Sequence, residues 1–444
     1  MSQSAPPLRL PFFYGWVVAA VAFVTMGVAV NARTAFSLLY PQILDEFGWQ
    51  RGETAAAFTV GFLAATLSAP LYGIVMDRWG PRVVIPIGAT VVASGFVAAT
   101  WITTPLTLYL SLGLLVVGGS VGMSYVGHSM FLPNWFVRNR GLAIGIAFSG
   151  VGVGAIVLLP LVQAYMTAAG WRAACVAIAV VIAVAIIPLN VMLQRRQPSD
   201  LGLEPDGGER RRKDGTRAEA VDTIVDRAWA ETDWTLPKAA RTARFWWIST
   251  GYFAGLFAWY SVQVHQTRYL IDIGMGATEA AFALGLVGLF GIAGQIGIGA
   301  LSDRIGREAA WALTCLGFAV AYVALIGLGE TPARWLVIVM VASQGLLGYG
   351  LASLFGAIPA EIFAGRRFAT ILSVTAAAGN AGAGIGPWVT GVIFDATGSY
   401  LPAFLLNLAM CAVSAFGIWM ASPRKVRLVA GQAAKRARAA ATLP

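Results

Sequence analysis

Two copies of one charged motif occur in the sequence, one in each half of the chain. Each copy places an aspartate, two arginines and two glycines in a polar turn between apolar runs. The aspartate can accept hydrogen bonds from free amides at the N-terminus of another helix, and the arginines can form charge-assisted hydrogen bonds. The motif predicts a clasp that holds one conformation closed; the alternative is a signal for membrane topology alone. The predicted clasp residues are Gly73, Asp77, Arg78, Gly80, Arg82, Gly299, Asp303, Arg304, Gly306 and Arg307.

Arg33 lies inside the first apolar run, near the predicted outer end of that run and close to Asn31. A guanidinium buried in hydrocarbon costs at least about 2.5–3.5 kcal/mol, so such a group usually faces a cavity or a partner. Its fork of donors matches a carboxylate. Arg33 and Asn31 are therefore predicted to bind an anionic substrate. The alternative is that Arg33 extends to the nearby membrane interface.

Groups that could carry protons are scarce within the apolar runs. No Asp or Glu lies in the middle third of any run, which argues against a carrier of cationic compounds. Histidine titrates near neutral pH, so His128 and His265 are candidates for proton coupling. The alternative for each is a hydrogen-bonded packing residue. Further polar residues predicted to contact substrate are Tyr125, Tyr260, Gln263, Gln295 and Asn380.

The composition places these groups in a membrane. Of the 444 residues 58% are hydrophobic and 12% charged, and the mean hydropathy is +0.71, unlike a soluble domain. A helix of about 20 apolar residues spans a hydrocarbon core of about 30 Å. We predict an all-α integral membrane protein with twelve transmembrane helices in two pseudo-symmetric six-helix bundles. The predicted spans are 13–39, 53–76, 83–103, 106–132, 141–167, 171–193, 244–270, 278–302, 309–328, 335–357, 368–394 and 400–421.

The distribution of Lys and Arg predicts the orientation, because positive residues stay on the cytoplasmic side. With both termini inside, the outer segments hold only Arg51, Arg172, Arg268 and Arg334. Both termini and the central loop are therefore predicted to be cytoplasmic, and a bacterial inner (plasma) membrane is the predicted location. The net charge of +10 then follows from topology, and no nucleic-acid partner is expected.

Four segments follow from this topology. The linker begins with a basic run, Arg210 to Lys213, that is predicted to be flexible, and ends with a predicted interfacial helix near Trp234. The basic tail is predicted to contact anionic membrane lipids. The segments are 1–193 (first bundle), 194–243 (linker), 244–422 (second bundle) and 423–444 (tail).

No cofactor or metal site is predicted. Cys175, Cys315 and Cys411 show no paired spacing and fall in apolar runs, which supports neither a disulfide framework nor metal ligation.

The doubled Gly-x-x-x-Asp-Arg-x-Gly pattern, between the second and third runs and between the eighth and ninth, resembles the signature loop of the major facilitator superfamily. The resemblance covers essentially the whole chain, through the span count, the six-plus-six division and the long central loop. It implies a two-lobed secondary transporter that works by alternating access.

Shorter strings resemble the monocarboxylate-porter and oxalate/formate-antiporter branches, which carry small organic anions by proton symport or by exchange. The porters carry a cation late in the first span, which the resemblance places at Arg33. Gln295 stands where such relatives have an arginine, and the lysine that the oxalate/formate exchangers have in the eleventh span has no counterpart, because that span offers only Asn380 as a strongly polar group. The substrate is therefore singly charged, differently held or not an anion. The strings are Tyr14-Gly15-Trp16, Phe47-Gly48-Trp49, Arg51-Gly52-Glu53, Gly170-Trp171-Arg172 and the run from Pro198 to Gly207.

Glycine rows occupy the fifth and eleventh runs and end near prolines. Small residues let helices approach closely, and a proline permits a bend, so the rows predict paired moving helices. The predicted bending residues are Pro160, Gly386 and Pro387.

We therefore predict a secondary active transporter of a small organic anion, a monocarboxylate, driven by proton symport or anion exchange and functional as a monomer. The alternatives are an exporter of neutral or lipophilic molecules and a receptor that transports nothing. An enzyme is not expected, because no nucleophile elbow or phosphate loop is visible and the water-facing segments are short.

Overall fold

The computed structural model describes residues 11–49, 51–207, 222–331 and 333–441. Eleven helical spans in these residues are long and apolar enough to cross a membrane. A twelfth helix, α12 (Ala243–Asp272), is 30 residues long but more polar. The protein is an all-α membrane protein of twelve spans, as predicted. The basic run from Arg210 to Lys213, predicted to be flexible, lies outside the described residues.

The first bundle contains the helices up to the linker, and its fourth span is interrupted. Its α-helices are α1 (Gly15–Thr34), α2 (Phe36–Phe47), α3 (Arg51–Trp79), α4 (Pro81–Ala99), α5 (Pro105–Leu108), α6 (Tyr125–Ser129), α7 (Arg140–Ala169), α8 (Trp171–Val181) and α9 (Ile187–Leu193).

The linker carries short helices, and the second bundle follows it. After α10 (Arg227–Ala230) and α11 (Leu236–Ala240) come α12, α13 (Ala277–Ile305), α14 (Arg307–Glu330), α15 (Arg334–Ala342), α16 (Leu351–Leu354), α17 (Ala357–Ile362), α18 (Phe368–Thr397) and α19 (Leu401–Ala421), and the tail forms α20 (Ala430–Ala441).

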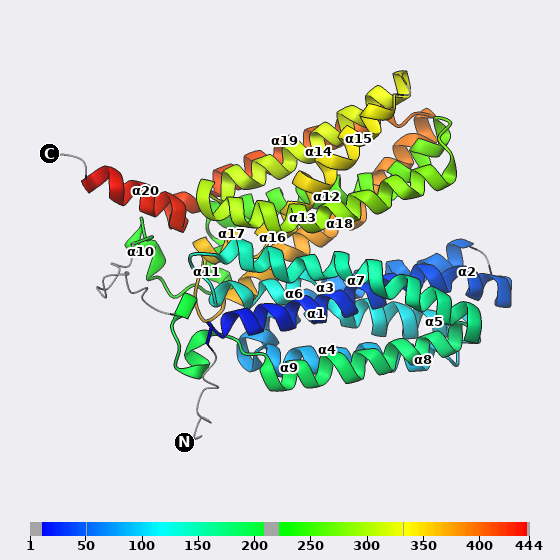
Figure 1. Ribbon diagram of the computed structural model, residues 1–444, viewed down its shortest axis with the longest axis horizontal. Helices are drawn as coiled ribbons and strands as arrows, with labels where there is room; N and C mark the ends of the chain where they lie inside the picture. Colours follow the sequence, from blue (N-terminus) through cyan, green and yellow to red (C-terminus); the bar gives the residue numbers. More distant parts are fainter. Residues whose placement is uncertain (1–10, 50, 208–221, 332, 442–444) are drawn as a thin grey trace.

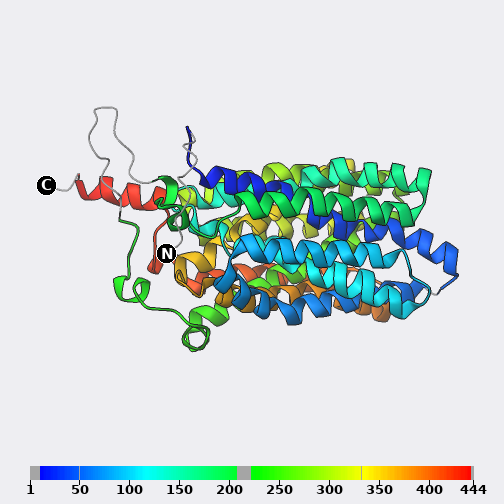
Figure 2. The same ribbon diagram turned by 90° about the horizontal axis from the view of Figure 1, so that it is seen from below.

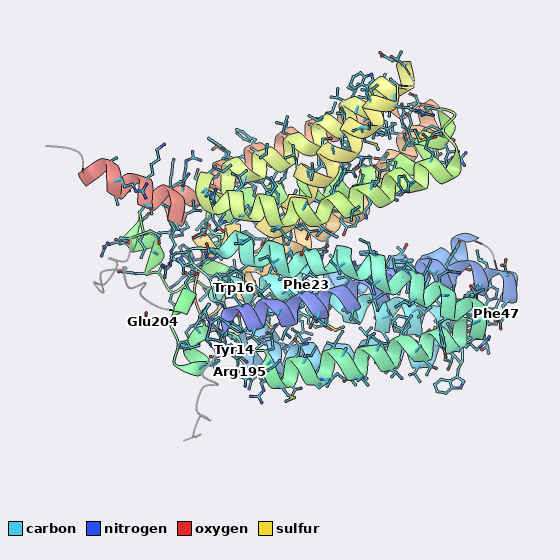
Figure 3. All side chains as sticks on the ribbon, viewed as in Figure 1. Tyr14, Trp16, Phe23, Phe47, Arg195 and Glu204 are labelled. Carbon is cyan, nitrogen blue, oxygen red and sulfur yellow. The ribbon has the colours of Figure 1, made fainter. Side chains whose placement is uncertain are left out.

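The two bundles lie side by side near one end of the molecule and diverge toward the other (Figure 1). Figures 1 and 2 both place the linker and α20 beyond the first of these ends, which we call the closed end. Tyr14 and Arg195 lie near it and Phe47 lies at the opposite, open end (Figure 3). The bundles meet where α7 packs against α13 and α3 packs against α18.

Glycines set the spacing of equivalent helix pairs in the two bundles. A Cβ on Gly150 of α7 would lie 2.2 Å from the carbonyl oxygen of Phe23 in α1. In the second bundle, a Cβ on Gly382 of α18 would lie 2.1 Å from the carbonyl oxygen of Phe253 in α12. The α1–α7 and α12–α18 pairs are therefore in backbone contact, as small-residue rows permit.

The first span is longer than predicted. It was expected to end near residue 39, but α1 passes through Ala35 into α2, which continues to Phe47 and ends at Gly48 with a left-handed φ of 64°. Arg33 therefore lies at the α1–α2 junction, well inside the span. The short path to the interface, on which the alternative interpretation of Arg33 depended, is absent.

The spans predicted at 106–132 and 335–357 lie within helical spans at Pro105–Asn134 and Arg334–Ile362, and each of these changes helix type along its length. The fourth changes from a π-helix, Tyr109–Val117, to a 3-10 helix, Gly118–Met123. The tenth does the same, from Ser343–Leu347 to Gly348–Gly350. At Gly113 a Cβ would lie 2.7 Å from the Ala57 carbonyl oxygen, so close packing of the helices requires glycine at this position. Glycine is a poor helix former, and the α-helical hydrogen-bond pattern is lost where glycines gather.

We expect Gly382→Ala to destabilise the protein by about 1–3 kcal/mol, because the added methyl group overlaps the Phe253 carbonyl. Gly384→Ala is the matched control on the same helix, since a Cβ there meets nothing within 4 Å. It should be neutral or stabilising by up to about 1 kcal/mol. Thermal unfolding in detergent, followed by tryptophan fluorescence, measures both; equal midpoints would contradict the packing argument.

Candidate functional site

Asp77, near the end of α3, joins the bundles at the closed end. Its carboxylate accepts hydrogen bonds from the backbone N–H of Ala369 (3.1 Å), the backbone N–H of Thr370 (2.8 Å) and the Thr370 hydroxyl (2.6 Å). These amides open α18, where N–H groups lack partners within the helix and the helix dipole favours negative charge. The first bundle thus caps a helix of the second.

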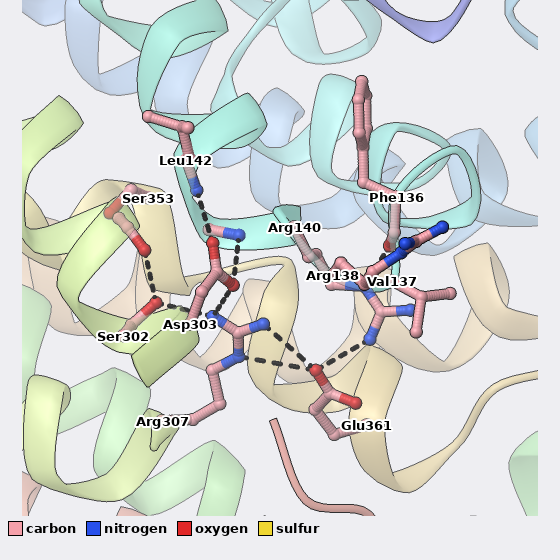
Figure 4. A network of polar contacts seen from close by, with 12 residues as sticks. Phe136, Val137, Arg138, Arg140, Leu142, Ser302, Asp303, Arg307, Ser353 and Glu361 are labelled. Carbon is pink, nitrogen blue, oxygen red and sulfur yellow. Dashed lines mark hydrogen bonds and ion pairs between the residues drawn. The ribbon is translucent and has the colours of Figure 1, made fainter. Parts of the chain in front are cut away.

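Asp303 makes the reciprocal contact from α13. Its two carboxylate oxygens accept from the backbone N–H groups of Gly141 and Leu142, each at 3.0 Å, at the start of α7 (Figure 4). The two copies of the motif therefore form two clasps, each a carboxylate of one bundle on a helix N-terminus of the other. This geometry holds the closed end shut.

Three buried charged side chains support the Asp303 clasp (Figure 4). The Arg307 guanidinium pairs with Asp303 at 2.9 Å and with Glu361 at 3.2 Å, and Arg140 reaches the same Glu361 oxygen at 2.8 Å. Arg140 belongs to the first bundle and Glu361 to the second. Removing one partner of this network would leave a buried charge without its counter-charge, at a cost of about 3–5 kcal/mol.

Arg140 and Glu361 are the functional residues that sequence reasoning missed. Their positions could have indicated a role, because Arg140 begins the fifth span and Glu361 lies at the end of the tenth. The other predicted arginines do not pair with the clasp aspartates. Arg82 donates through Nε to the Val191 carbonyl (2.6 Å), Arg78 lies over the Trp79 ring and Arg304 is exposed.

The motif glycines have two distinct roles. A Cβ on Gly73 would lie 2.3 Å from the Ser373 hydroxyl, and one on Gly299 would lie 2.2 Å from the Gly141 carbonyl oxygen, so both permit contact between bundles. Gly80 and Gly306 adopt φ of 73° and 104° in the turns that follow. Side chains rarely adopt these angles, which explains why glycine stands there.

Arg33 lies beside an aromatic residue of the first bundle. Its guanidinium carbon is 5.5 Å from the centre of the Phe62 ring in α3, and the side chain is half-buried. The predicted contact Tyr125 packs against Phe148 in the first bundle, and Tyr260 and Tyr349 both pack against Trp259 in the second. No carboxylate pairs with Arg33 among the described residues. Tyr349 was not predicted, because it lies within the interrupted tenth span.

Two of the predicted substrate contacts, Asn31 and Gln295, are buried between helices. The buried Asn31 amide donates to the carbonyl oxygens of Gly27 (2.8 Å) and Val151 (2.9 Å) and links α1 to α7. Gln295 is 3% exposed where α13 meets α7, and its backbone oxygen would touch a Cβ on Gly145. Its side-chain oxygen has no hydrogen-bond partner in the described part of the chain.

Gln263 of α12 and Asn380 of α18 are half-buried, and the structure records no side-chain hydrogen bond for either within its described residues. Their amides are available to a ligand. They stay predicted substrate contacts.

The two histidines have different surroundings. His128 is fully buried; Nδ1 lies 3.1 Å from the Ser124 carbonyl oxygen, and Nε2 has no partner in the described residues. His265 lines a cavity of about 720 Å³ at the open end of the second bundle. Its Nδ1 lies 3.3 Å from the Tyr400 hydroxyl and its Nε2 lies 2.9 Å from the Pro387 carbonyl oxygen.

The predicted bending residues lie within helices that continue past them. Pro160 is inside α7 and Pro387 inside α18. Gly386 packs against α12, where a Cβ would lie 2.4 Å from the Phe257 carbonyl oxygen. His265 thus contacts α18 at the carbonyl oxygen of the proline that was predicted to let this helix bend.

Two membrane bundles that exchange helix caps at one end, together with an arginine inside a span that pairs with no carboxylate of the described residues, are the arrangement of a membrane transporter. The family model of the Major Facilitator Superfamily matches residues 19–355, and the chain belongs to this superfamily. Its members transport small molecules across membranes.

Relatives and solved structures agree with this assignment. The chain is 27% identical to monocarboxylate transporter 11 of Homo sapiens over 422 residues, covering 93% of this chain and 83% of that protein. It is 24% identical to the oxalate:formate antiporter of Oxalobacter formigenes over 403 residues, covering 88% and 90%. The transporter FucP in the outward conformation superposes with a TM-score of 0.66 at 17% identity, covering 92% and 98%.

We expect Asp77→Asn and Asp303→Asn to open the closed end. Losing a charged acceptor of two hydrogen bonds costs about 1.5–3 kcal/mol, which shifts a two-state equilibrium about tenfold or more. A Ser129→Cys reporter suits the test, because Ser129 is buried against Gly356 of the other bundle. Its maleimide labelling rate should rise about tenfold in either variant.

The control is Asp226→Asn, which removes a carboxylate that caps only its own helix in the linker. Labelling of the reporter should not change there. The three native cysteines are buried, so labelling of the protein without the reporter cysteine gives the background rate. Unchanged labelling in both clasp variants would exclude the clasps as determinants of closure.

Proposed function

We propose that the protein transports a small organic anion, a monocarboxylate, by proton symport or anion exchange. The observation that carries this proposal is Arg33: a half-buried guanidinium inside the first span, without a carboxylate partner among the described residues. Such a group requires a counter-charge in a low dielectric, and a substrate carboxylate supplies one. The similarity to a monocarboxylate transporter and an oxalate:formate antiporter supports the class.

We place the closed end at the cytoplasm, which makes the described conformation outward-facing. The support is the Lys and Arg excess of the sequence in the termini and linker, because the described linker helices α10 and α11 and the tail helix α20 lie at this end (Figures 1 and 2). Substrate would then enter from outside, between the two bundles at the open end, where helices such as α18 expose side chains. Trp388 of α18, for example, is 66% exposed, whereas Leu372 near the closed end of the same helix is buried.

Transport requires the clasps to break when the bundles close around substrate. A carboxylate held by Arg33 and Tyr125 of the first bundle can also contact Tyr260 and Tyr349 of the second, which favours their approach. The free energy gained at this contact offsets the loss of the Asp77 and Asp303 caps at the other end. The neutral side chains of Gln295 and Asn380 favour a substrate with one negative charge over a dicarboxylate.

Of the two histidines, His265 has the position needed for proton coupling. It lines a cavity at the open end, and its ring nitrogens contact the Pro387 carbonyl oxygen in α18 and the Tyr400 hydroxyl. Protonation converts both ring nitrogens to donors and changes this pair of contacts. A proton taken up there would therefore change how α12 holds α18.

We expect small monocarboxylates, but not their amides, to raise the thermal stability of the detergent-purified protein. A ligand at 100 times its dissociation constant adds about 2.7 kcal/mol to the free energy of unfolding. Arg33→Gln should weaken this binding about tenfold or more. Arg268→Gln is the control, because that arginine lies at the same end but is paired with Asp272 at 2.9 Å.

Stabilisation by neutral or cationic lipophiles instead, unaffected by Arg33→Gln, would contradict the anion carrier. The aromatic group of Trp259, Tyr260 and Tyr349 would then bind an apolar substrate, as in the exporter alternative.

We expect carboxylate uptake into proteoliposomes to increase several-fold when the external medium is made about two pH units more acidic than the interior, because proton symport draws on the inward proton gradient. His265→Gln should remove the pH response while counterflow exchange continues. His128→Gln, the control, should keep the pH response, since His128 is buried away from this cavity. A response that survives His265→Gln would assign coupling to another group or to the substrate.

A further inference from the structure

A basic pocket of about 510 Å³ opens at the closed end, beside the Asp77 clasp. It lies between the last turn of α3, the linker and the start of α18, and residues of both bundles form it. Its lining residues are Ile74, Asp77, Arg78, Arg196, Asp233, Leu236, Pro237, Arg366, Arg367 and Thr370.

Arg196 links the two sides of the pocket. Its guanidinium donates to the carbonyl oxygen of Asp77 in the first bundle and to that of Arg366 in the second, the latter at 3.0 Å. This side chain already bridges the two bundles through neutral acceptors only. It forms no ion pair with a carboxylate among the described residues, although the Asp77 carboxylate lies near enough to attract it.

The other three arginines are also without carboxylate partners in the described part of the chain. Two carboxylates share the pocket. The Asp77 carboxylate accepts the hydrogen bonds of the α18 N-terminus, and Asp233 is exposed. Four guanidinium groups against two carboxylates leave the pocket positively charged.

We propose that this pocket binds a phosphate group and that the ligand is the headgroup of an anionic phospholipid. Guanidinium groups form paired, charge-assisted hydrogen bonds to phosphate oxygens, and four of them converge here with room for a headgroup. The inference rests on the closed end alone and does not depend on the transported substrate.

An apolar stripe on α3 favours a lipid over a soluble phosphate. Leu67, Leu71 and Ile74 are 80%, 61% and 53% exposed, and their spacing places them on one helix face. The stripe leads directly into the pocket, of which Ile74 and Arg78 are part. An acyl chain along this face would bring its phosphate to the arginines.

The pocket exists only while the bundles are closed here, because Arg78 belongs to the first and Arg366 and Arg367 belong to the second. A ligand that binds one state and not the other shifts the equilibrium toward the state it binds. Anionic lipid would therefore stabilise the closed end and act together with the two aspartate clasps.

The test measures binding of short-chain phosphatidylglycerol to the purified full-length protein by native mass spectrometry and thermal shift, beside phosphatidylcholine of the same chain length and glycerol phosphate. We expect selective binding of phosphatidylglycerol. The double variant Arg366→Gln/Arg367→Gln should weaken it about tenfold or more. The matched control Arg268→Gln/Arg334→Gln removes two arginines outside the pocket, at the opposite end of the bundles, and should leave it unchanged.

Asp303→Asn, which we expect to open the closed end from outside the pocket, should also weaken lipid binding, because the pocket needs both bundles. Equal binding of glycerol phosphate and phosphatidylglycerol, lost in the pocket variant, would keep the phosphate site but overturn the lipid as its ligand. Equal loss in the pocket variant and the control variant, or no loss in either, would overturn the site, since the effect would then be one of general surface charge. None of these readouts involves transport, so they are independent of the proposed substrate.

Discussion

The first backbone N–H groups of a helix have no acceptor within that helix. In this protein, a carboxylate of the opposite bundle supplies the acceptor at two helix N-termini. Asp77 caps α18 and Asp303 caps α7, so both bundles lose hydrogen bonds when they separate at this end. In a weakly solvated setting such groups cannot remain unpaired without cost. Opening therefore requires water to enter the contact, which favours two discrete arrangements over a continuous range.

The two clasps are related by pseudo-symmetry but differ in chemistry. Around Asp303, Arg307, Glu361 and Arg140 form a buried network with almost no exposure. Around Asp77, the partner side chain is the Thr370 hydroxyl, and the nearby arginines face a wet pocket. The buried network is the more rigid and less salt-sensitive half, whereas the wet half is open to regulation by ions or lipid headgroups.

The sequence analysis predicted the features that depend on local pattern: the spans, the repeated motif and the close-packed glycine rows. It missed what depends on register and tertiary contact. Arg307, not Arg304, pairs with Asp303 because residues four apart share a helix face. Arg140 and Glu361 become partners only when the bundles meet, and Asn31 has its role because Val151 lies opposite. Hydropathy does not distinguish a regular helix from the π and 3-10 segments of the fourth and tenth spans.

The polarity of α12 has a consequence for biosynthesis. Among the long helices of the described residues, only α12 is less hydrophobic than a membrane span requires. Its Gln266 side-chain amide is buried and has no hydrogen-bond partner in the described residues. The helices that cover it, α18 and α19, are the last two spans of the chain. During synthesis α12 must therefore wait for a segment that begins only at Phe368 before its polar face is enclosed. Truncations of the last two spans would thus deprive an early helix of its stable place in the bilayer.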